Sequence, residues 1–227
     1  MSWIGSFYRS AIGKKAVMAV TGVVMFGWIL AHMAGNLKIF FGPEKYQAYA
    51  DWLRVMGAPL LPHEAGLWIA RVVTLLVIVF HIHSAYSLTV MNRLARPIAY
   101  RDRDYVASSY ASRTMRWGGA IVLLYIIYHL LHLTWGKPVS PAEFIHGDVY
   151  HNVVAGFQVW WVSAIYILAN VALGFHLFHG LWSMFNSLGI DHPRITGLKR
   201  AFATAFAIIV TVGNVSIPVA VMLGLVR

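Results

Sequence analysis

Residues 66–92 decide the fold, and they read GLWIARVVTLLVIVFHIHSAYSLTVMN. The stretch contains no acidic residue, and its basic side chains are Arg71, His81 and His83. It exceeds the ~20 apolar residues that a helix needs to cross a bilayer. Its apolar residues are continuous rather than alternating, which favours a helix over a strand of a membrane barrel. The stretch therefore predicts a transmembrane helix.

Four more runs of the same kind flank it, so we expect an all-α membrane protein with five transmembrane helices. They should span 15–40, 66–92, 115–135, 156–185 and 201–225, with residues 1–227 forming a single transmembrane domain. Composition agrees, because 59% of the residues are hydrophobic and only 11% are charged, whereas soluble domains have about 25% charged residues. The proline-rich connection 41–65 is expected to carry a short helix at the membrane interface.

Basic residues predict the orientation of the helices. The net charge is +10, and the cations lie in the connections between apolar runs instead of forming a nucleic-acid-binding patch. Twelve would lie on one side of the membrane: Arg9, Lys14, Lys15, Arg93, Arg96, Arg101, Arg103, Arg113, Arg116, Arg194, Lys199 and Arg200. Six would lie on the other: Lys38, Lys45, Arg54, Arg71, Lys137 and Arg227. The positive-inside rule places the N-terminus in the cytoplasm, and we expect no nucleic-acid partner.

Histidines inside the expected helices are the strongest sign of function. The chain has no cysteine, which excludes disulfides, iron–sulfur clusters and covalently attached haem from it. It has eleven histidines, and seven fall inside expected helices: His32, His81, His83, His129, His132, His176 and His179. Ionisable groups are costly at membrane depth and usually serve a function. One alone could bond a backbone carbonyl, but each of the first four helices carries at least one.

Depth sorts four of these histidines into two levels. His32 and His129 lie roughly 25 and 20 Å along helices that run outward, at 1.5 Å per residue. His83 and His176 lie roughly 15 Å from the inner ends of helices that run inward. Haem iron readily accepts axial imidazole. We therefore expect two non-covalent b haems, an outer one at His32 and His129 and an inner one at His83 and His176.

The remaining histidines leave alternatives open. His81 points to a different helix face from His83, and His132 and His179 each follow an expected ligand at a spacing of three residues. The His-x-x-His spacing also suits a zinc or iron site. A His-lined metal or proton transporter without haem is therefore an alternative function, and a purely structural anchor is another. We favour hydrogen bonds from His132 and His179 to haem propionates or to quinone.

Four local patterns surround these histidines. They are His32-Met-Ala-Gly-Asn36, His83-Ser-Ala-Tyr-Ser, Arg116-Trp-Gly-Gly119 followed by His129, and Phe175-His-Leu-Phe-His-Gly-Leu-Trp182. In this order the chain resembles the di-haem, five-helix cytochrome b subunits of succinate dehydrogenases and quinol:fumarate reductases, over nearly its whole length. The resemblance favours His83 over His81 and His129 over His132 as ligands. It implies the same two pairs as the depths of the histidines.

The resemblance also implies an assembly. A flavoprotein subunit and an iron–sulfur subunit would dock on the cytoplasmic face, so the succinate site would lie outside this chain. The chain would exchange electrons with a quinone, typically menaquinone, in the cytoplasmic membrane of a prokaryote. Arg71 and Arg116 are candidates to neutralise haem propionates on the outer and inner sides. The di-haem anchor of another enzyme, such as a respiratory nitrate reductase, is the alternative within electron transfer.

One departure from the family concerns protons. Some fumarate-reducing members carry a glutamate inside the fourth helix, near its haem ligand, that is proposed to conduct protons. Here residues 156–185 contain no acid, so a proton path through that helix is not expected. Glu44, Asp51 and Glu64, on the expected outer side, are candidates to protonate quinone.

Overall fold

The computed structural model describes residues 3–95, 110–136 and 139–227, and its regular elements are all helical. Within these ranges five helices are long and apolar enough to cross a membrane: Ala11–Phe41, Ala65–Leu94, Met115–Trp135, Trp160–Ser187 and Pro193–Met222. The prediction of an all-α membrane protein with five such helices is confirmed. Of the cations used to predict its orientation, Arg96, Arg101, Arg103 and Lys137 lie outside the described residues.

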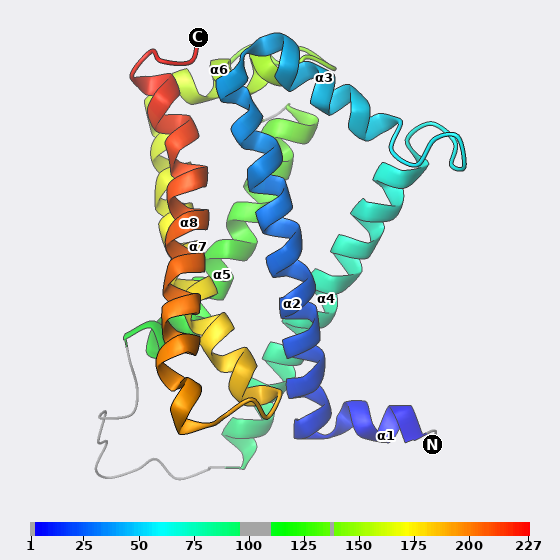
Figure 1. Cartoon of the computed structure of the whole chain (residues 1–227), viewed down its shortest axis with the longest axis vertical. Coiled ribbons are helices and arrows are strands. Elements are labelled where there is room, and N and C mark those ends of the chain that lie inside the picture. The colour runs from blue at the N-terminus through cyan, green and yellow to red at the C-terminus, as the bar shows by residue number, and fades with distance from the viewer. Residues whose placement is uncertain (1–2, 96–109, 137–138) are drawn as a thin grey trace.

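The helices follow one another along the chain as Figure 1 shows. In order they are α1 (Trp3–Arg9), α2 (Ala11–Asn36), η1 (Leu37–Phe41), α3 (Pro43–Arg54), α4 (Ala65–Leu94), α5 (Tyr110–Leu130), η2 (Leu131–Trp135), α6 (Val149–Gln158), α7 (Trp160–Ser187), η3 (Pro193–Ile195) and α8 (Thr196–Met222). The N-terminus and α1 lie at one end of the bundle, and α3, α6 and the C-terminus lie at the other. We call these the inner end and the outer end.

Caps and turns explain where the first helices begin and end. The Ser10 hydroxyl accepts a hydrogen bond from the Gly13 amide at 2.9 Å and caps the start of α2. At the other end Gly42, with a φ of 94°, turns the chain into α3. The expected short helix in the 41–65 connection is confirmed as α3.

Tyr46 attaches α3 to the end of α2. Burial, with a smaller contribution from Tyr49, raises the pKa of the Tyr46 hydroxyl to about 12. The hydroxyl therefore stays protonated at neutral pH, and it donates to the Asn36 side-chain oxygen at 3.4 Å. This contact holds α3 across the outer end of the bundle.

The fourth membrane helix begins later than the sequence predicts. We expected it to start at residue 156, but α6 continues to Gln158, and Val159 then adopts extended backbone with φ −80° and ψ 108°. The Ser163 hydroxyl donates to the Phe157 carbonyl at 2.7 Å and holds this break. The break contains no proline or glycine. The apolar sequence therefore gives no sign that one helix ends and another begins there.

Helix α7 is the centre of the packing. It contacts α2, α5, α6 and α8. It packs most extensively on α8, where a Cβ on Gly174 would collide with the Thr211 hydroxyl. Met33, Leu173, Leu177, Ala207 and Val210 form a buried cluster that joins α2, α7 and α8.

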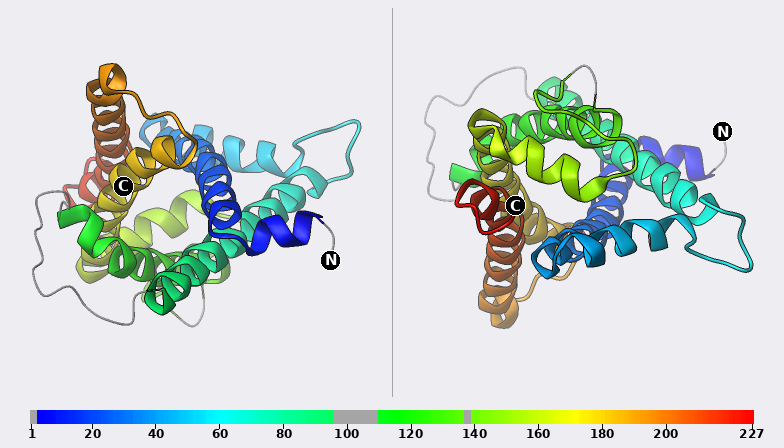
Figure 2. Two further views of the ribbon diagram at one scale, coloured as in Figure 1. Left: turned by 90° about the horizontal axis from the view of Figure 1, so that it is seen from below. Right: turned by 90° about the horizontal axis from the view of Figure 1, so that it is seen from above.

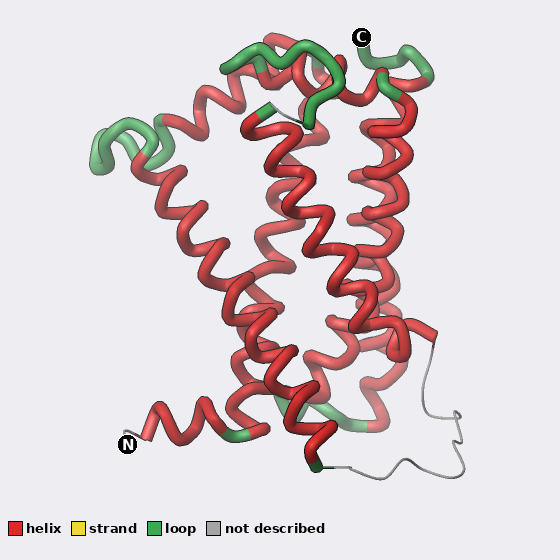
Figure 3. The backbone as a smooth tube through the Cα atoms, turned by 180° about the vertical axis from the view of Figure 1, so that it is seen from behind, coloured by secondary structure: helices red, strands yellow, loops and turns green. Residues whose placement is uncertain are grey.

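Helices α2, α4, α5 and α7 are arranged around the bundle axis, as the end-on views of Figure 2 show. Helix α4 packs chiefly on α2 and α3, and α5 packs chiefly on α7. Toward the outer end α4 leans away from the other helices (Figures 1 and 3). The helices that carry the expected haem ligands therefore face one another across this axis.

Candidate functional site

At the outer level, His32 of α2 faces His129 of α5. Their ring centroids are 5.9 Å apart and their planes are nearly perpendicular, at 89°. Trp28, one turn earlier on α2, stacks on His32 with a centroid distance of 4.7 Å. The Tyr166 hydroxyl of α7 lies 3.3 Å from Nδ1 of His129. Since that contact uses Nδ1, Nε2 is the nitrogen of His129 that is available to a ligand.

At the inner level, His176 of α7 faces His81 of α4. Their ring centroids are 6.5 Å apart. The Thr21 hydroxyl of α2 donates to the Val17 carbonyl at 2.7 Å and lies 3.1 Å from Nδ1 of His81. Because the hydroxyl gives its proton to the carbonyl, it accepts from Nδ1–H of His81. Nδ1 of His176 is buried and has no hydrogen-bond partner among the described residues.

His83 lies on another face of α4 and contacts α1. Its Nδ1 is hydrogen-bonded to the Tyr8 hydroxyl, and the two rings stack with centroids 5.7 Å apart. The ammonium group of Lys14 lies 3.8 Å from the centre of the Tyr8 ring. The sequence pairs His83 with His176 as ligands of the inner haem, whereas the ring that lies opposite His176 is that of His81. Residues two apart on a helix point about 200° apart, and α4 turns His81 toward the bundle interior.

A group of polar side chains surrounds the outer pair. We call it the outer polar cluster, and its members are Tyr125, Tyr128, His129, His132, Tyr166 and Asn170. His132 lies in the π-helical turn η2 and is 1% exposed. Its Nδ1 lies 3.0 Å from the Tyr166 hydroxyl, and its Nε2 has no hydrogen-bond partner among the described residues. The Asn170 amide donates to the Tyr166 carbonyl at 2.8 Å and to the Tyr125 hydroxyl at 3.3 Å.

The other residues singled out from the sequence lie apart from the two pairs. Arg71 is exposed, and its guanidinium lies 4.8 Å from the centre of the Trp68 ring. Arg116 is also exposed, and His179 is half-buried on α7 beyond His176. Zinc sites use three or four protein ligands. Within 3–95, 110–136 and 139–227, no group of three or more His, Asp or Glu side chains could hold a metal ion.

Both histidine pairs fit haem. Two imidazoles that share one metal ion stand with ring centres about 6 Å apart, because each metal–nitrogen bond is about 2 Å long. Small residues flank the inner pair. A Cβ on Gly119 would lie 3.5 Å from Cε1 of His176, and one on Gly22 would lie 4.0 Å from Cε1 of His81. At both positions a glycine, and not a larger side chain, stands beside one of the facing imidazoles.

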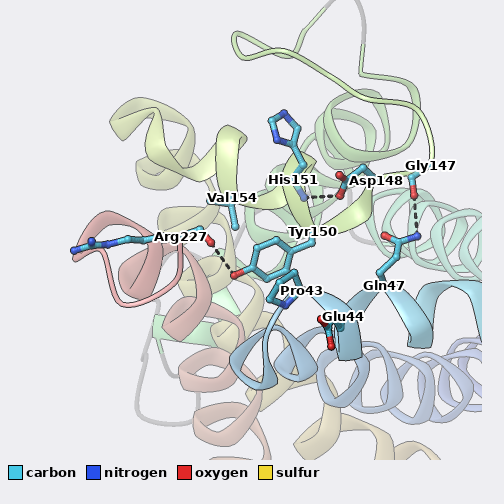
Figure 4. A pocket seen from close by; sticks show the side chains of 9 residues that line it. All are labelled: Pro43, Glu44, Gln47, Gly147, Asp148, Tyr150, His151, Val154 and Arg227. Atoms are coloured by element: carbon cyan, nitrogen blue, oxygen red, sulfur yellow. Dashed lines mark hydrogen bonds between the residues drawn. The ribbon is translucent and has the colours of Figure 1, made fainter.

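A pocket of about 570 Å³ lies at the outer end, between α3, α6 and the chain end (Figure 4). Its lining residues are Pro43, Glu44, Gln47, Gly147, Asp148, Tyr150, His151, Val154 and Arg227. The Gln47 amide donates to the Gly147 carbonyl at 2.9 Å, and the Tyr150 hydroxyl donates to the Arg227 carbonyl at 3.0 Å. Of the three outer acids expected to serve quinone, Glu44 lines this pocket.

The other two outer acids have partners of their own. Asp51 accepts from the Gln47 amide at 3.1 Å. Glu64 forms an ion pair with Arg54, with 2.7 Å between the charged atoms. Of these three acids, Glu44 therefore lines the pocket, beside Asp148, whose carboxylate caps α6 by accepting from the His151 amide at 2.9 Å.

Comparison with known proteins identifies the family. The model of the family described as succinate dehydrogenase/fumarate reductase transmembrane subunit matches residues 92–215, which is more than half of the chain. The match includes His129 and His176, while the histidines of α2 and α4 precede it. No curated protein and no solved structure matches the chain. With its five membrane helices, the chain belongs to the family of transmembrane subunits that anchor succinate dehydrogenase and fumarate reductase.

Proposed function

We propose that this chain is a di-haem cytochrome b that carries electrons between an iron–sulfur subunit and a membrane quinone. Family membership supports its association with the catalytic subunits of succinate dehydrogenase or fumarate reductase. Within that assembly the chain is the quinone-reactive subunit, and succinate or fumarate binds elsewhere. The observation that carries the proposal is the pair of facing histidines at each of two levels, with ring centres 5.9 and 6.5 Å apart.

Each haem would be held between two helices. His32 and His129 would hold the outer haem, and His176 would hold the inner one with a histidine of α4. Side-chain geometry favours His81 for that role, whereas the sequence pattern favours His83. When bound, haem b supplies one-electron chemistry at its iron.

The protein's contribution is to orient the imidazoles and to keep water away from them. Thr21 and Tyr166 each contact the Nδ1 of a facing histidine. A partner at Nδ1 fixes the tautomer and the ring orientation of a metal-binding histidine. The apolar helices around the pairs provide the low dielectric in which such contacts affect a redox potential most.

The orientation of the complex follows from charge. Exposed cations gather at the inner end, where Arg93, Arg116, Arg194 and Arg200 project from the helix ends. By the positive-inside rule this end faces the cytoplasm, where the iron–sulfur and flavoprotein subunits would dock. We place the protein in the cytoplasmic membrane of a prokaryote and expect menaquinone as its quinone.

The outer pocket is our candidate for quinone exchange. Its volume of about 570 Å³ lies within the usual range of small-molecule sites. Glu44 and His151 line it, and carboxyl and imidazole side chains are the usual groups that transfer protons in general acid–base catalysis.

Single histidine substitutions in the purified complex test the two-haem proposal. His32→Ala and His129→Ala should remove the same haem and keep the other, and His176→Ala should remove the second one. Redox titration of the remaining haem identifies which one is lost. Equal loss of both haems from His32→Ala and from His176→Ala would contradict two separate sites.

A further inference from the structure

Tyr166 joins two histidines that belong to neighbouring turns of α5 and η2. Its side chain is 4% exposed, and its hydroxyl reaches Nδ1 of His129 at 3.3 Å and Nδ1 of His132 at 3.0 Å. The ring is held edge-on against Phe157, with centroids 4.7 Å apart. The hydroxyl is therefore fixed between the two imidazoles.

The protons on His129, Tyr166 and His132 suggest which of these side chains donates each hydrogen bond and which accepts it. A tyrosine hydroxyl has one proton to donate and lone pairs that accept. If His129 binds a metal through Nε2, its neutral ring carries its proton on Nδ1, and that N–H donates to the Tyr166 oxygen. The Tyr166 hydroxyl can then donate its own proton to Nδ1 of His132, the nearer of the two nitrogens at 3.0 Å. In this arrangement His132 carries its own proton on Nε2.

The surroundings of His132 agree with a ring that is held in one orientation. Its ring stacks on Tyr128 with centroids 5.7 Å apart, at 17° between the planes. On the other side α6 approaches so closely that a Cβ on Gly156 would lie 2.7 Å from Cε1 and Nε2 of His132. Flipping the ring would bring a carbon to the Tyr166 hydroxyl and lose the hydrogen bond.

We propose that Tyr166 is a positioning residue for His129: it accepts the Nδ1–H of His129 and donates to Nδ1 of His132, so that the Nε2 of His129 is presented to the outer haem. This inference rests on the proposed function, because it concerns a ligand of one of the two haems. It assigns to this tyrosine and to His132 a joint effect on the outer haem alone. An acceptor at Nδ1 makes an imidazole ligand more basic, which favours the oxidised iron.

The test compares Tyr166→Phe with Tyr128→Phe in the purified complex. Tyr166→Phe keeps the ring and removes the oxygen. Tyr128→Phe removes a buried hydroxyl of the same cluster that has no hydrogen-bond partner among the described residues. Haem content, the midpoint potential of each haem and its low-temperature electron paramagnetic resonance signal are measured. We expect Tyr166→Phe to raise the potential of the outer haem and shift its signal, and Tyr128→Phe to change neither.

The outcomes separate this inference from the proposed function. Two haems with unchanged potentials in Tyr166→Phe, or equal shifts in both variants, would overturn the role of Tyr166 and leave the proposed function intact. A wild-type complex without haem would overturn both. If Tyr166→Phe does not assemble, ¹⁵N resonance of labelled histidine in the wild-type complex decides, with His132→Gln to assign the signal. Protonation of His132 at Nε2 is expected, and protonation at Nδ1 would contradict the proposal.

Discussion

The imidazole of His81 lies opposite that of His176, with 6.5 Å between the ring centroids, while His83 is hydrogen-bonded to Tyr8 outside this pair. Thr21 ties Nδ1 of His81 to α2, in the same way that Tyr166 ties Nδ1 of His129 to α7. The two levels of histidines thus share one arrangement, in which a hydroxyl from a third helix contacts one imidazole of each pair.

This arrangement predicts different results for the two histidines of α4. His81→Ala should remove the inner haem, halving the haem content per chain, because no other imidazole faces His176 in the described part of the chain. His83→Ala should keep both haems and lose only its contact with Tyr8. Pyridine haemochrome analysis of the purified complexes measures the haem content. Loss of a haem from His83→Ala, with both retained in His81→Ala, would assign the ligand to His83.

Gly156 should not tolerate a side chain, because the buried ring of His132 already occupies the space that a Cβ needs. Gly156→Ala should lower the stability of the complex by about 1–3 kcal/mol, the usual cost of overpacking. Gly118→Ala is the matched control, since nothing lies within 4 Å of its added Cβ. It should leave the stability unchanged or slightly raised. Thermal unfolding in detergent compares them, and equal stability of the two variants would refute the close contact.

Lys199 should stabilise the fold as well as add to the positive charge of the inner end. It is 4% exposed, and its ammonium group donates to Asn186 Oδ1, the Ile190 carbonyl and Asp191 Oδ1 at 2.9–3.0 Å. These bonds hold the connection between α7 and α8. Lys199→Met should cost about 2–3 kcal/mol, because it leaves the oxygens without their charged donor.

Asp191→Asn measures how much the ion pair between Lys199 and Asp191 contributes to stability, apart from the other hydrogen bonds of Lys199. The Asp191 side chain is 68% exposed, so its charge should contribute less than about 1 kcal/mol. Thermal unfolding of both variants measures the difference. A larger loss from Asp191→Asn than from Lys199→Met would mean that the ion pair, and not the buried hydrogen bonds, holds the connection.

Glu44→Gln should slow electron transfer to quinone without loss of haem. Glu44 lines the outer pocket, and general acid–base catalysis contributes about 100-fold or more, so a drop of at least tenfold in quinone-linked turnover is expected. Glu64→Gln is the control, because Glu64 is paired with Arg54 away from the pocket. Equal turnover in Glu44→Gln and the wild type would remove this pocket as the quinone site.

Much of the fold could be predicted because membrane helices are specified by length and apolarity. The second helix, predicted at 66–92, is observed as Ala65–Leu94, and the connection after α2 carries the expected short helix. Depth also places His32 and His129 at a similar level, and their rings face each other in the structure. Such features depend on positions along one helix at a time.

What could not be predicted depends on contacts between helices. Depth does not distinguish His81 from His83, because the choice requires knowing which face of α4 packs on α2. The break at Val159 leaves no mark in an apolar sequence, since a tertiary contact of Ser163 holds it. Tyr166 and Lys199 were missed for the same reason. A tyrosine in an apolar run and a lysine in a connection predicted between two helices are ordinary until their partners are known.

The central claim is tested most directly by a dithionite-reduced minus oxidised spectrum of the purified complex, with haem quantified per polypeptide. We expect two non-covalent b haems for each chain of this subunit. A complex that contains the chain in full amount but no b haem would contradict it, and the histidine pairs would then need another function.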